Sequence, residues 1–183
     1  RSRGVHHIES PAMITLARMC GIKEIHGLVA LVSVIRPGAA NQGKKQAFAR
    51  RYQGMEPVTY DHPSLESCLS DAYGMVIYEE HILKICERFA GMNPGQADLL
   101  RRALGKAKSS QIIELKKQFV AAARRLERPE SVIQKVWEQV EGFAGYAFCK
   151  AHSAAYAVEA YGAAWLKFYH PAEFMAAVLS GGK

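Results

Sequence analysis

The residues of this sequence that are best suited to chemistry lie between positions 98 and 108, where four Lys or Arg residues occur within eight positions. Arg101 and Arg102 carry guanidinium groups, whose paired N–H donors match the oxygens of a phosphate. Asp98 precedes them by three and four residues, which on a helix is close enough to orient both side chains. Arg102 and Lys106 are like charges at i,i+4, and a bound polyanion would remove their repulsion. The spacing therefore predicts an anion-binding site at the end of a helix.

The helix that must position these cations has an apolar face. Four residues of the same segment form it: Leu99, Leu100, Ala103 and Leu104. Gly105 can end the helix, and cations also suit the carboxyl end of a helix dipole. An ordinary solvated cationic face would show the same pattern, so the spacing alone leaves both interpretations open.

The positive charge of the chain is concentrated around this segment. The 183 residues contain 24 Lys or Arg and 17 Asp or Glu, which gives a net charge of +7. Nine of the basic residues lie between Arg101 and Arg128, against only two acidic residues, so this segment accounts for the whole +7. Local positive charge is typical of proteins that bind nucleic acids or nucleotides, although lysine-rich helix faces also serve solubility.

Further cations lie outside the segment that begins at Asp98. Residues 36–54 contain no acidic residue, and we expect a loop and a short helix there. Residues 112–126 have apolar positions at 3-4-3-4 spacing, which predicts an amphipathic helix. The cations of these two segments that are candidates for contact with a nucleic-acid backbone are Lys44, Lys45, Arg50, Arg51, Lys116 and Lys117.

No catalytic or metal centre is predicted within this chain. Its three aspartates are widely separated, whereas a two-metal site needs clustered carboxylates. Glu79 and Glu80 are adjacent, but neighbouring residues on a helix point about 100° apart. The four cysteines and seven histidines lack the spacing of a zinc site, and reduced, buried thiols are the expected state of the cysteines. The sequence also lacks a phosphate-binding loop and a nucleophile elbow.

Composition favours one ordinary globular domain. Hydrophobic residues make up 49% of the chain and charged residues 22%. No apolar run approaches the roughly 20 residues that cross a bilayer, and no signal peptide opens the sequence. We therefore expect an intracellular protein, and the abrupt start suggests a piece of a longer chain.

The order of elements predicts an all-α fold, mainly helical, with one or two short strands as the open alternative. Ser10 and Pro11 predict the start of a helix that ends at Gly21. Residues 74–78 fit either a strand or the start of the next helix. Helices are predicted around the following segments: 25–35, 61–69, 82–91, 98–105, 112–126, 132–143, 153–167 and 171–179.

Six motifs then occur in the order found in bacterial C-family DNA polymerases. They are Arg36-Pro-Gly, Tyr60-Asp-His-Pro-Ser-Leu-Glu, Tyr73-Gly-Met-Val-Ile-Tyr-Glu-Glu, Ala97-Asp-Leu-Leu-Arg-Arg-Ala-Leu-Gly-Lys, Phe143-Ala-Gly-Tyr-Ala-Phe-Cys-Lys-Ala-His-Ser-Ala-Ala-Tyr-Ala and His170-Pro-Ala-Glu-Phe-Met-Ala-Ala-Val-Leu. Gly4-Val-His-His-Ile-Glu-Ser also resembles the family's passage from the palm. The whole chain resembles the fingers region of the bacterial DNA polymerase III alpha subunit.

This resemblance implies a role for each group of cations. Arg101, Arg102 and Lys106 match the residues expected to bind the triphosphate of an incoming dNTP, with Lys150 and His152 as secondary candidates. The cations named above as backbone candidates would contact the DNA template-primer. The metal-binding aspartates and their Mg²⁺ are expected in the palm, so the fragment alone should bind no cofactor and catalyse no reaction.

The resemblance also implies an organisation and partners. Residues 1–35 would be the helices that lead in from the palm side, 36–60 a basic loop region, 61–179 the main helical body and 180–183 an exit linker. Further partners would be the sliding clamp and other replisome subunits, reached through the parent chain. A cytoplasmic, nucleoid-associated bacterial protein without membrane contact is expected.

Three departures from the family pattern leave its branch open, either replicative or error-prone. Tyr78-Glu79-Glu80-His81 replaces the usual Tyr-Gln-Glu-Gln, Phe148-Cys149-Lys150-Ala151-His152 replaces Phe-Asn-Lys-Ser-His, and Ala39 stands where proline is usual. Two other functions remain as alternatives: a stand-alone helical nucleic-acid-binding module and a helical protein-interaction module.

Overall fold

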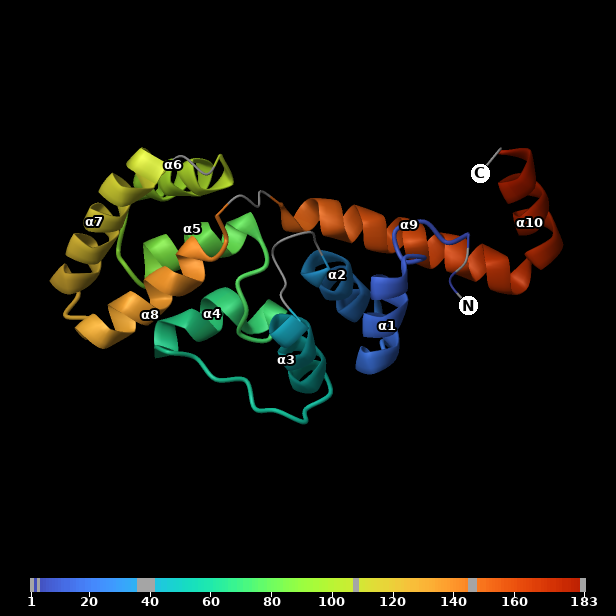
Figure 1. Cartoon of the computed structure of the whole chain (residues 1–183), viewed down its shortest axis with the longest axis horizontal. Coiled ribbons are helices and arrows are strands. Elements are labelled where there is room, and N and C mark those ends of the chain that lie inside the picture. Colours follow the sequence, from blue (N-terminus) through green and yellow to red (C-terminus); the bar gives the residue numbers. More distant parts are fainter. Residues whose placement is uncertain (1, 3, 36–41, 107–108, 145–147, 182–183) are drawn as a thin grey trace.

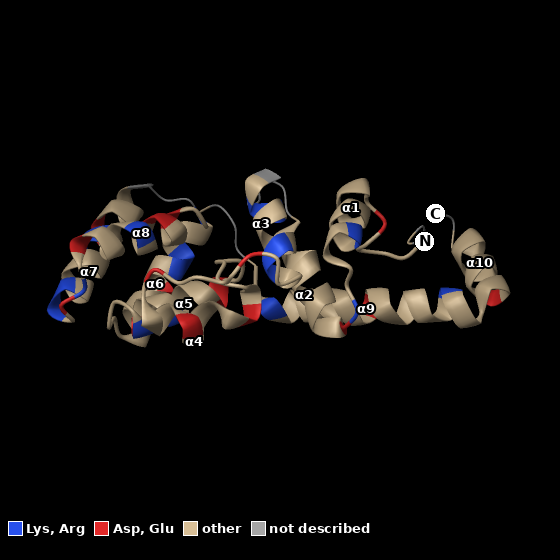
Figure 2. Cartoon of the chain, turned by 90° about the horizontal axis from the view of Figure 1, so that it is seen from below, with Lys and Arg blue, Asp and Glu red and all other residues tan. Residues whose placement is uncertain are grey.

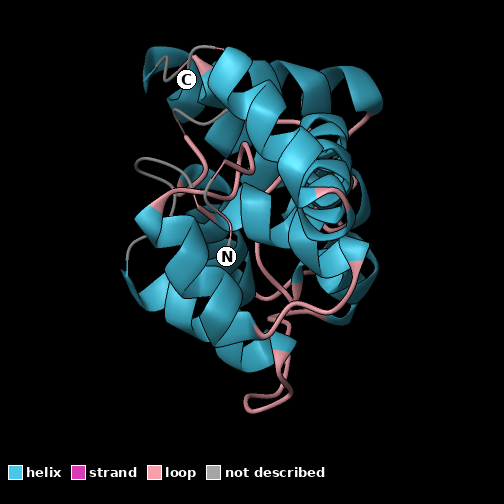
Figure 3. Ribbon diagram, turned by 90° about the vertical axis from the view of Figure 1, so that its right-hand side faces the viewer, coloured by secondary structure: helices cyan, strands magenta, loops and turns pink. Residues whose placement is uncertain are grey.

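The computed structural model describes residues 2, 4–35, 42–106, 109–144 and 148–181. Within these residues every regular element is helical, as Figure 3 shows, which confirms the all-α prediction. The α-helices are α1 (Pro11–Cys20), α2 (Ile25–Val34), α3 (Gln42–Tyr52), α4 (Glu66–Leu69), α5 (Glu79–Arg88), α6 (Pro94–Gly105), α7 (Ser109–Arg125), α8 (Glu130–Glu141), α9 (Lys150–Tyr169) and α10 (Pro171–Ser180). Two short 3-10 helices, η1 (Pro63–Leu65) and η2 (Ser70–Ala72), flank α4.

Local sequence signals set where α1 begins and ends and where α6 begins. The Ser10 hydroxyl accepts a hydrogen bond from the first turn of α1, and Pro11 follows it. Gly21 ends α1 in the left-handed conformation, with a φ of 62°. At the start of α6, the side chains of Asn93 and Gln96 each accept from the other's backbone N–H, at 2.9 and 3.3 Å. The predicted limits of the first helix are confirmed.

Residues 74–78 form a loop that leads into α5, so the strand alternative is wrong. The backbone N–H groups of Ile77 and Tyr78 donate to Nδ1 of His81 at 3.2 and 3.4 Å. Because a side chain of the following helix satisfies these donors, the segment needs no neighbouring strand.

Two hydrophobic cores divide the molecule into two lobes. The larger core joins α4 to α8 and is built around aromatic and aliphatic side chains that are almost fully buried: Ile82, Phe89, Leu100, Phe119 and Trp137. The smaller core lies among α1, α2 and α3 and contains Leu16, Leu31 and Phe48. Figure 1 shows these lobes side by side, with α6, α7 and α8 at one end of the molecule.

Helix α9 leaves the larger lobe and runs along α2. The hydroxyls of Ser33 on α2 and Ser153 on α9 lie 2.5 Å apart and are buried. Ala157 and Ala160 of α9 are fully buried. Small side chains of this kind let two helices, here α2 and α9, approach closely. Figure 1 shows α9 continuing to α10, close to both ends of the described chain.

Some predicted features lie outside the described residues. They are the end of the second helix at Arg36-Pro37-Gly38, the departure at Ala39, the cation Lys108 and the last two residues of the exit linker. The division of the chain into segments at positions 35, 60 and 179 stays a prediction. Among the described residues, none of the helices is long and apolar enough to cross a membrane.

Candidate anion-binding site

Three consecutive residues at the start of α5 contact three other parts of the fold. Glu79 accepts from Arg101 of α6, Glu80 accepts from the first residue of α9, and His81 contacts Asp71 of η2. The two glutamates thus point to different helices, as the angle between neighbouring helical residues predicts. This junction fixes α6 and α9, the two helices that carry the predicted phosphate-binding cations.

Arg101 is held between two carboxylates. Its Nε and one terminal nitrogen donate to Oδ1 of Asp98 at 3.0 and 2.8 Å, and the other terminal nitrogen donates to Glu79 at 2.9 Å. The side chain is 23% exposed. These contacts, above all the hydrogen bonds to Asp98, raise the pKa of the guanidinium. Three of its five N–H donors are therefore occupied, and two remain for a ligand.

Arg102 lies one residue further along α6 and faces solvent. One of its terminal nitrogens is 2.7 Å from Oδ2 of Asp98, and 63% of its side chain is exposed. Asp98 therefore contacts both arginines, which confirms the orientation predicted from the sequence. Hydrogen bonding to Arg101 is the main cause that lowers the pKa of the Asp98 carboxyl.

Lys106 follows directly at the carboxyl end of α6. It is exposed and is the residue that ends the helix, with its backbone N–H bonded to Arg102. Its ammonium makes no ion pair with the described residues. The exposed charges of Arg102 and Lys106 thus stand one helical turn apart, and together with Arg101 they can receive a polyanion.

Lys150, at the start of α9, is held at the same junction. Its ammonium lies 2.6 Å from Oδ2 of Asp71 and 5.7 Å from the centre of the Tyr78 ring. Its backbone N–H donates to both oxygens of Glu80 at 3.1 Å. A carboxylate at the amino end of a helix is stabilised by the helix dipole, so Glu80 acts as a cap for α9. His152, which is exposed on the first turn of α9, lies near the ring of Phe148, at 5.9 Å between centres.

The hydrogen bonds around His81 determine where its ring proton lies. Nδ1 accepts from two backbone N–H groups, so the proton of the neutral imidazole is on Nε2. Nε2 then donates to Oδ1 of Asp71 at 3.0 Å. This hydrogen bond is the main cause that lowers the pKa of Asp71, and the ammonium of Lys150 contributes. The buried side chain of His81 thus orients the carboxylate that holds Lys150.

The four basic side chains of α3 that are predicted to contact nucleic acid differ in their exposure to solvent. Figure 2 shows that α3 carries positive but no negative residues. Lys44 lies at the exposed surface and Lys45 is half-buried. Arg50 is 64% exposed and lies 3.6 Å from Glu56. Arg51 is only 19% exposed, because it donates to Glu56 and to the carbonyl of Tyr73 at 3.1 Å each. Arg51 therefore holds a loop in place.

The two predicted contacts on α7 also differ from each other. Lys116 lies 5.6 Å from the ring centre of Trp137 and is half-buried. Lys117 is 72% exposed and lies 3.7 Å from Glu114. In Figure 2, positive and negative residues are interspersed along the lobe of α4–α8. The structure thus brings Arg101, Arg102 and Lys106 together and joins Lys150 to them through α5, but it leaves the cations of α3 and α7 on separate helices.

Sequence reasoning missed the positioning role of four residues that contact these cations or their helices: Asp71, Glu79, Glu80 and His81. Their partners lie between 10 and 79 residues away in the chain, so helical spacing alone reveals none of them. The one feature of the sequence that could have drawn attention to these residues is the departure from the family pattern at positions 78–81.

The aspartates of the described chain are unsuited to a two-metal centre. Asp71 and Asp98 bind Lys150 and the arginines of α6, and Asp61 accepts from Gln139 at 2.7 Å. Each carboxylate serves a different contact, whereas two-metal catalysis needs carboxylates that share ions about 4 Å apart.

The four cysteines are free, and burial raises the pKa of the Cys20 thiol to about 11.

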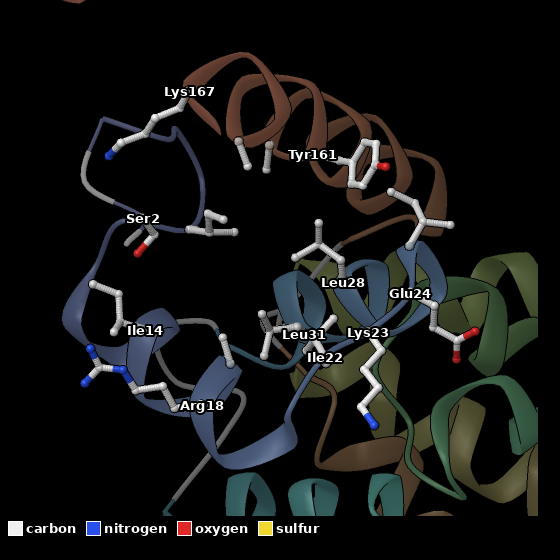
Figure 4. A pocket seen from close by; sticks show the side chains of 15 residues that line it. Ser2, Ile14, Arg18, Ile22, Lys23, Glu24, Leu28, Leu31, Tyr161 and Lys167 are labelled. Atoms are coloured by element: carbon white, nitrogen blue, oxygen red, sulfur yellow. The ribbon is translucent and has the colours of Figure 1, made fainter. Parts of the chain in front are cut away.

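A pocket of about 990 Å³ lies in the other lobe, between α1, α2 and α9. Its lining is mainly aliphatic and includes Ile14, Leu28 and Leu31. Figure 4 shows Arg18 and Lys23 at its edge, with Lys167 on the opposite side. This pocket is separate from the cationic end of α6.

Comparisons with known proteins, by a family model and by individual relatives, indicate the same family. The sequence model of the bacterial DNA polymerase III alpha subunit finger domain matches residues 1–127. The DNA polymerase III subunit alpha of Aquifex aeolicus is 37% identical over 183 residues, which is all of this chain. The proteins of the same name from Caulobacter vibrioides and Escherichia coli K12 are 40% and 36% identical over 177 and 181 residues. The chain spans only 15–16% of the length of these relatives.

Proposed function

Since this chain belongs to the family of bacterial DNA polymerase III alpha subunit finger domains, we propose that it binds the triphosphate of an incoming dNTP and contacts the template-primer during DNA synthesis. The reaction would be that of a DNA-directed DNA polymerase, in DNA replication or in error-prone repair synthesis. The observation that carries this proposal is the cationic end of α6, where Asp98 orients Arg101 and Arg102 beside the exposed Lys106.

The three cations of α6 have different parts in the proposed site. Arg102 and Lys106 are exposed and can reach a ligand without breaking a buried contact. Arg101 is tied to Glu79 and Asp98, and its two remaining N–H donors can add a phosphate contact from a fixed position. Phosphoryl transfer depends mainly on positioning and on stabilisation of charge, and one fixed and two exposed cations can supply both.

The proposed reaction uses Mg²⁺, but we do not assign this ion to the described residues. When bound, the ion would supply positive charge that stabilises the transferring phosphoryl group. The aspartates of this chain are unsuited to the ion, so we propose that carboxylates in the palm of the parent chain hold it. The residues of this chain would bind and orient the phosphates.

Lys150 and His152 are the secondary candidates for the triphosphate. Lys150 has its ammonium fixed by Asp71 and 45% of its side chain exposed, so it can face a second anion. His152 lies within the first turn of the same helix and is exposed. Both lie at the end of α9 that is joined to α6 through α5.

Contacts with the DNA backbone are proposed for the cations of α3 and α7. Lys44, Arg50 and Lys117 are exposed, and Lys45 is half-buried. Arg51, which is held by Glu56 and Tyr73, and Lys116, which lies against Trp137, are less available to a phosphate. The sliding clamp and other replisome subunits would be reached through the parent chain, and a cytoplasmic, nucleoid-associated location is part of the same proposal.

The test is nucleotide incorporation by the full polymerase chain that carries this domain. Arg102→Ala is compared with Arg124→Ala, an arginine of α7 that is 61% exposed and paired with Glu130 at 2.8 Å. The two residues match in type, exposure and ion pairing, so a loss of incorporation confined to the Arg102 variant would support the proposed site. Equal rates in both variants would favour a solvated cationic face.

A further inference from the structure

Two adjacent histidines before α1 face a glutamate in the middle of α9. Nδ1 of His6 lies 3.5 Å from one carboxylate oxygen of Glu159, and Nε2 of His7 lies 3.1 Å from the other. The three candidate ligand atoms all lie within 4.8 Å of one another. His7 and Glu159 are 152 residues apart in the sequence, so only the packing of the fold brings them together.

The backbone at His7 turns both imidazoles to the same side. Its φ is +66°, in the left-handed region that residues other than glycine rarely adopt. Side chains of neighbouring residues normally point apart in helices and strands. Here the rings of His6 and His7 stack instead, with centres 4.1 Å apart and an angle of 28° between their planes. Unusual backbone geometry of this kind is often found at ligand-binding sites.

Neighbouring contacts hold this arrangement in place before any ligand binds. The His7 ring stacks on Tyr156, one turn before Glu159 on α9, at 4.1 Å between centres. Gly4 donates its backbone N–H to the carboxylate of Glu9 at 3.1 Å, which closes the loop that carries the histidines. As a result, only 19% of the His7 side chain is exposed, although His6 and Glu159 are 60% and 57% exposed.

We propose that His6, His7 and Glu159 bind one first-row divalent metal ion, for which Zn²⁺ is the best fit. Imidazole nitrogens and a carboxylate oxygen are common zinc ligands. With bonds of about 2.0–2.1 Å, tetrahedral ligands lie about 3.3–3.4 Å apart. Each histidine lies near this distance from one of the two carboxylate oxygens, His6 at 3.5 Å from one and His7 at 3.1 Å from the other. The ligand atoms lie within 4.8 Å of one another, so small side-chain rotations would bring all three around one ion. Three protein ligands leave the fourth position to water.

The bound ion would connect the segment before α1 to the middle of α9. This site differs from the cationic end of α6 and from the Mg²⁺ proposed for the palm, because its ligands are two neutral imidazoles and one carboxylate. The inference therefore stands independently of the proposed polymerase function. Its expected effect is structural: Zn²⁺ should stabilise the folded chain, since a ligand that binds only the folded state raises the midpoint of unfolding.

The test is titration of Zn²⁺ alone into the metal-stripped full chain, followed by calorimetry, with Co²⁺ absorption as a report on tetrahedral coordination. The key variants are His7→Asn, because asparagine tolerates a left-handed φ, and Glu159→Gln, which keeps the shape of the side chain. The wild type should bind one equivalent of Zn²⁺ more than either variant. Loss of a residue that only hydrogen-bonds to a metal ligand weakens metal binding roughly 10- to 100-fold. Loss of a ligand itself, as in these two variants, should weaken Zn²⁺ binding by more than that.

The matched controls are His26→Asn on α2 and Glu173→Gln on α10, which remove the same chemical groups elsewhere. Both controls should keep the wild-type stoichiometry and the rise in unfolding midpoint with Zn²⁺. The proposal is overturned if wild type, key variants and controls bind the same number of ions with the same affinity. It is also overturned if Glu159→Gln binds like the wild type, because the two histidines alone would then explain the binding.

Discussion

The guanidinium of Arg101 donates to the carboxylate of Glu79 at 2.9 Å, and this contact joins the cationic end of α6 to the beginning of α5. The next residue, Glu80, accepts from the first backbone N–H of α9. One turn of α5 thus fixes two helices that carry proposed phosphate ligands. Arg101 is consequently both a positioning residue for the junction and a candidate ligand.

The first prediction concerns Arg102 and Lys106. Loss of one charge-assisted phosphate contact should cost about 1.5–3 kcal/mol, and each 1.36 kcal/mol changes a rate by about tenfold. In the full polymerase chain, Arg102→Ala and Lys106→Ala should each lower the efficiency of nucleotide incorporation by roughly 10- to 100-fold. Steady-state or single-turnover incorporation measures this, with Arg124→Ala as control. Variants that match this control would show that the triphosphate assignment is wrong.

A second prediction concerns the contact between Glu79 and Arg101. Both side chains are about four-fifths buried, so their interaction should exceed that of an exposed ion pair. A double-mutant cycle with Glu79→Gln and Arg101→Gln should give a coupling free energy of about 1–2 kcal/mol in denaturant unfolding. The exposed pair of Arg124 and Glu130 serves as the comparison and should give a smaller coupling free energy, because solvent screens exposed ion pairs. Equal coupling in the two pairs would mean that the junction does not depend on this contact.

The third prediction is a pH dependence that arises from Asp71. Its pKa in the folded chain lies below the ordinary value of 3.8, chiefly because His81 donates to it. The carboxylate therefore stabilises the fold fully above pH 3.8, and this contribution is lost as the pH falls below that value. The difference in free energy of unfolding between wild type and Asp71→Asn should be constant between roughly pH 5 and 7 and should shrink at lower pH. Chemical denaturation across this range measures the difference, and a constant difference down to the lowest pH would contradict the assignment.

The fourth prediction concerns DNA binding by the 183-residue chain. Contacts with backbone phosphates release counterions, so affinity should fall steeply as salt concentration rises and should vary little with sequence. Fluorescence anisotropy with several duplexes of unrelated sequence, at increasing salt, measures both properties. Affinity that is insensitive to salt, or clearly specific for one sequence, would favour the alternative of a stand-alone nucleic-acid-binding module.

The fifth prediction concerns catalysis by the same chain. Its aspartates serve separate protein contacts, so we expect no primer extension with Mg²⁺ or Mn²⁺. A primer-extension assay with rigorously purified chain, beside a complete polymerase as positive control, measures this. Primer extension by the chain itself would contradict the proposal that the metal-binding carboxylates lie in the palm.

Several features could be predicted from the sequence because they depend on residues within one helical turn. Asp98 contacts Arg101 and Arg102 since side chains three and four residues apart share one face of a helix. Ser10 and Pro11 begin a helix because a side-chain acceptor and a fixed φ suit its first turn. The all-α fold followed from the same periodicity, and the ordered motifs identified the family. The strand alternative at residues 74–78 failed because His81 satisfies backbone donors that would otherwise need a neighbouring strand.

Only the tertiary structure decided which distant residues meet. Arg101 reaches Glu79 across 22 residues, Lys150 reaches Glu80 across 70, and His7 reaches Glu159 across 152. These contacts depend on how two hydrophobic cores set α5, α6 and α9 against their neighbours, and local spacing carries no information about such packing. For the same reason the histidines lacked the spacing of a metal site in the sequence, since the third proposed ligand, Glu159, comes from a distant part of the chain, on α9.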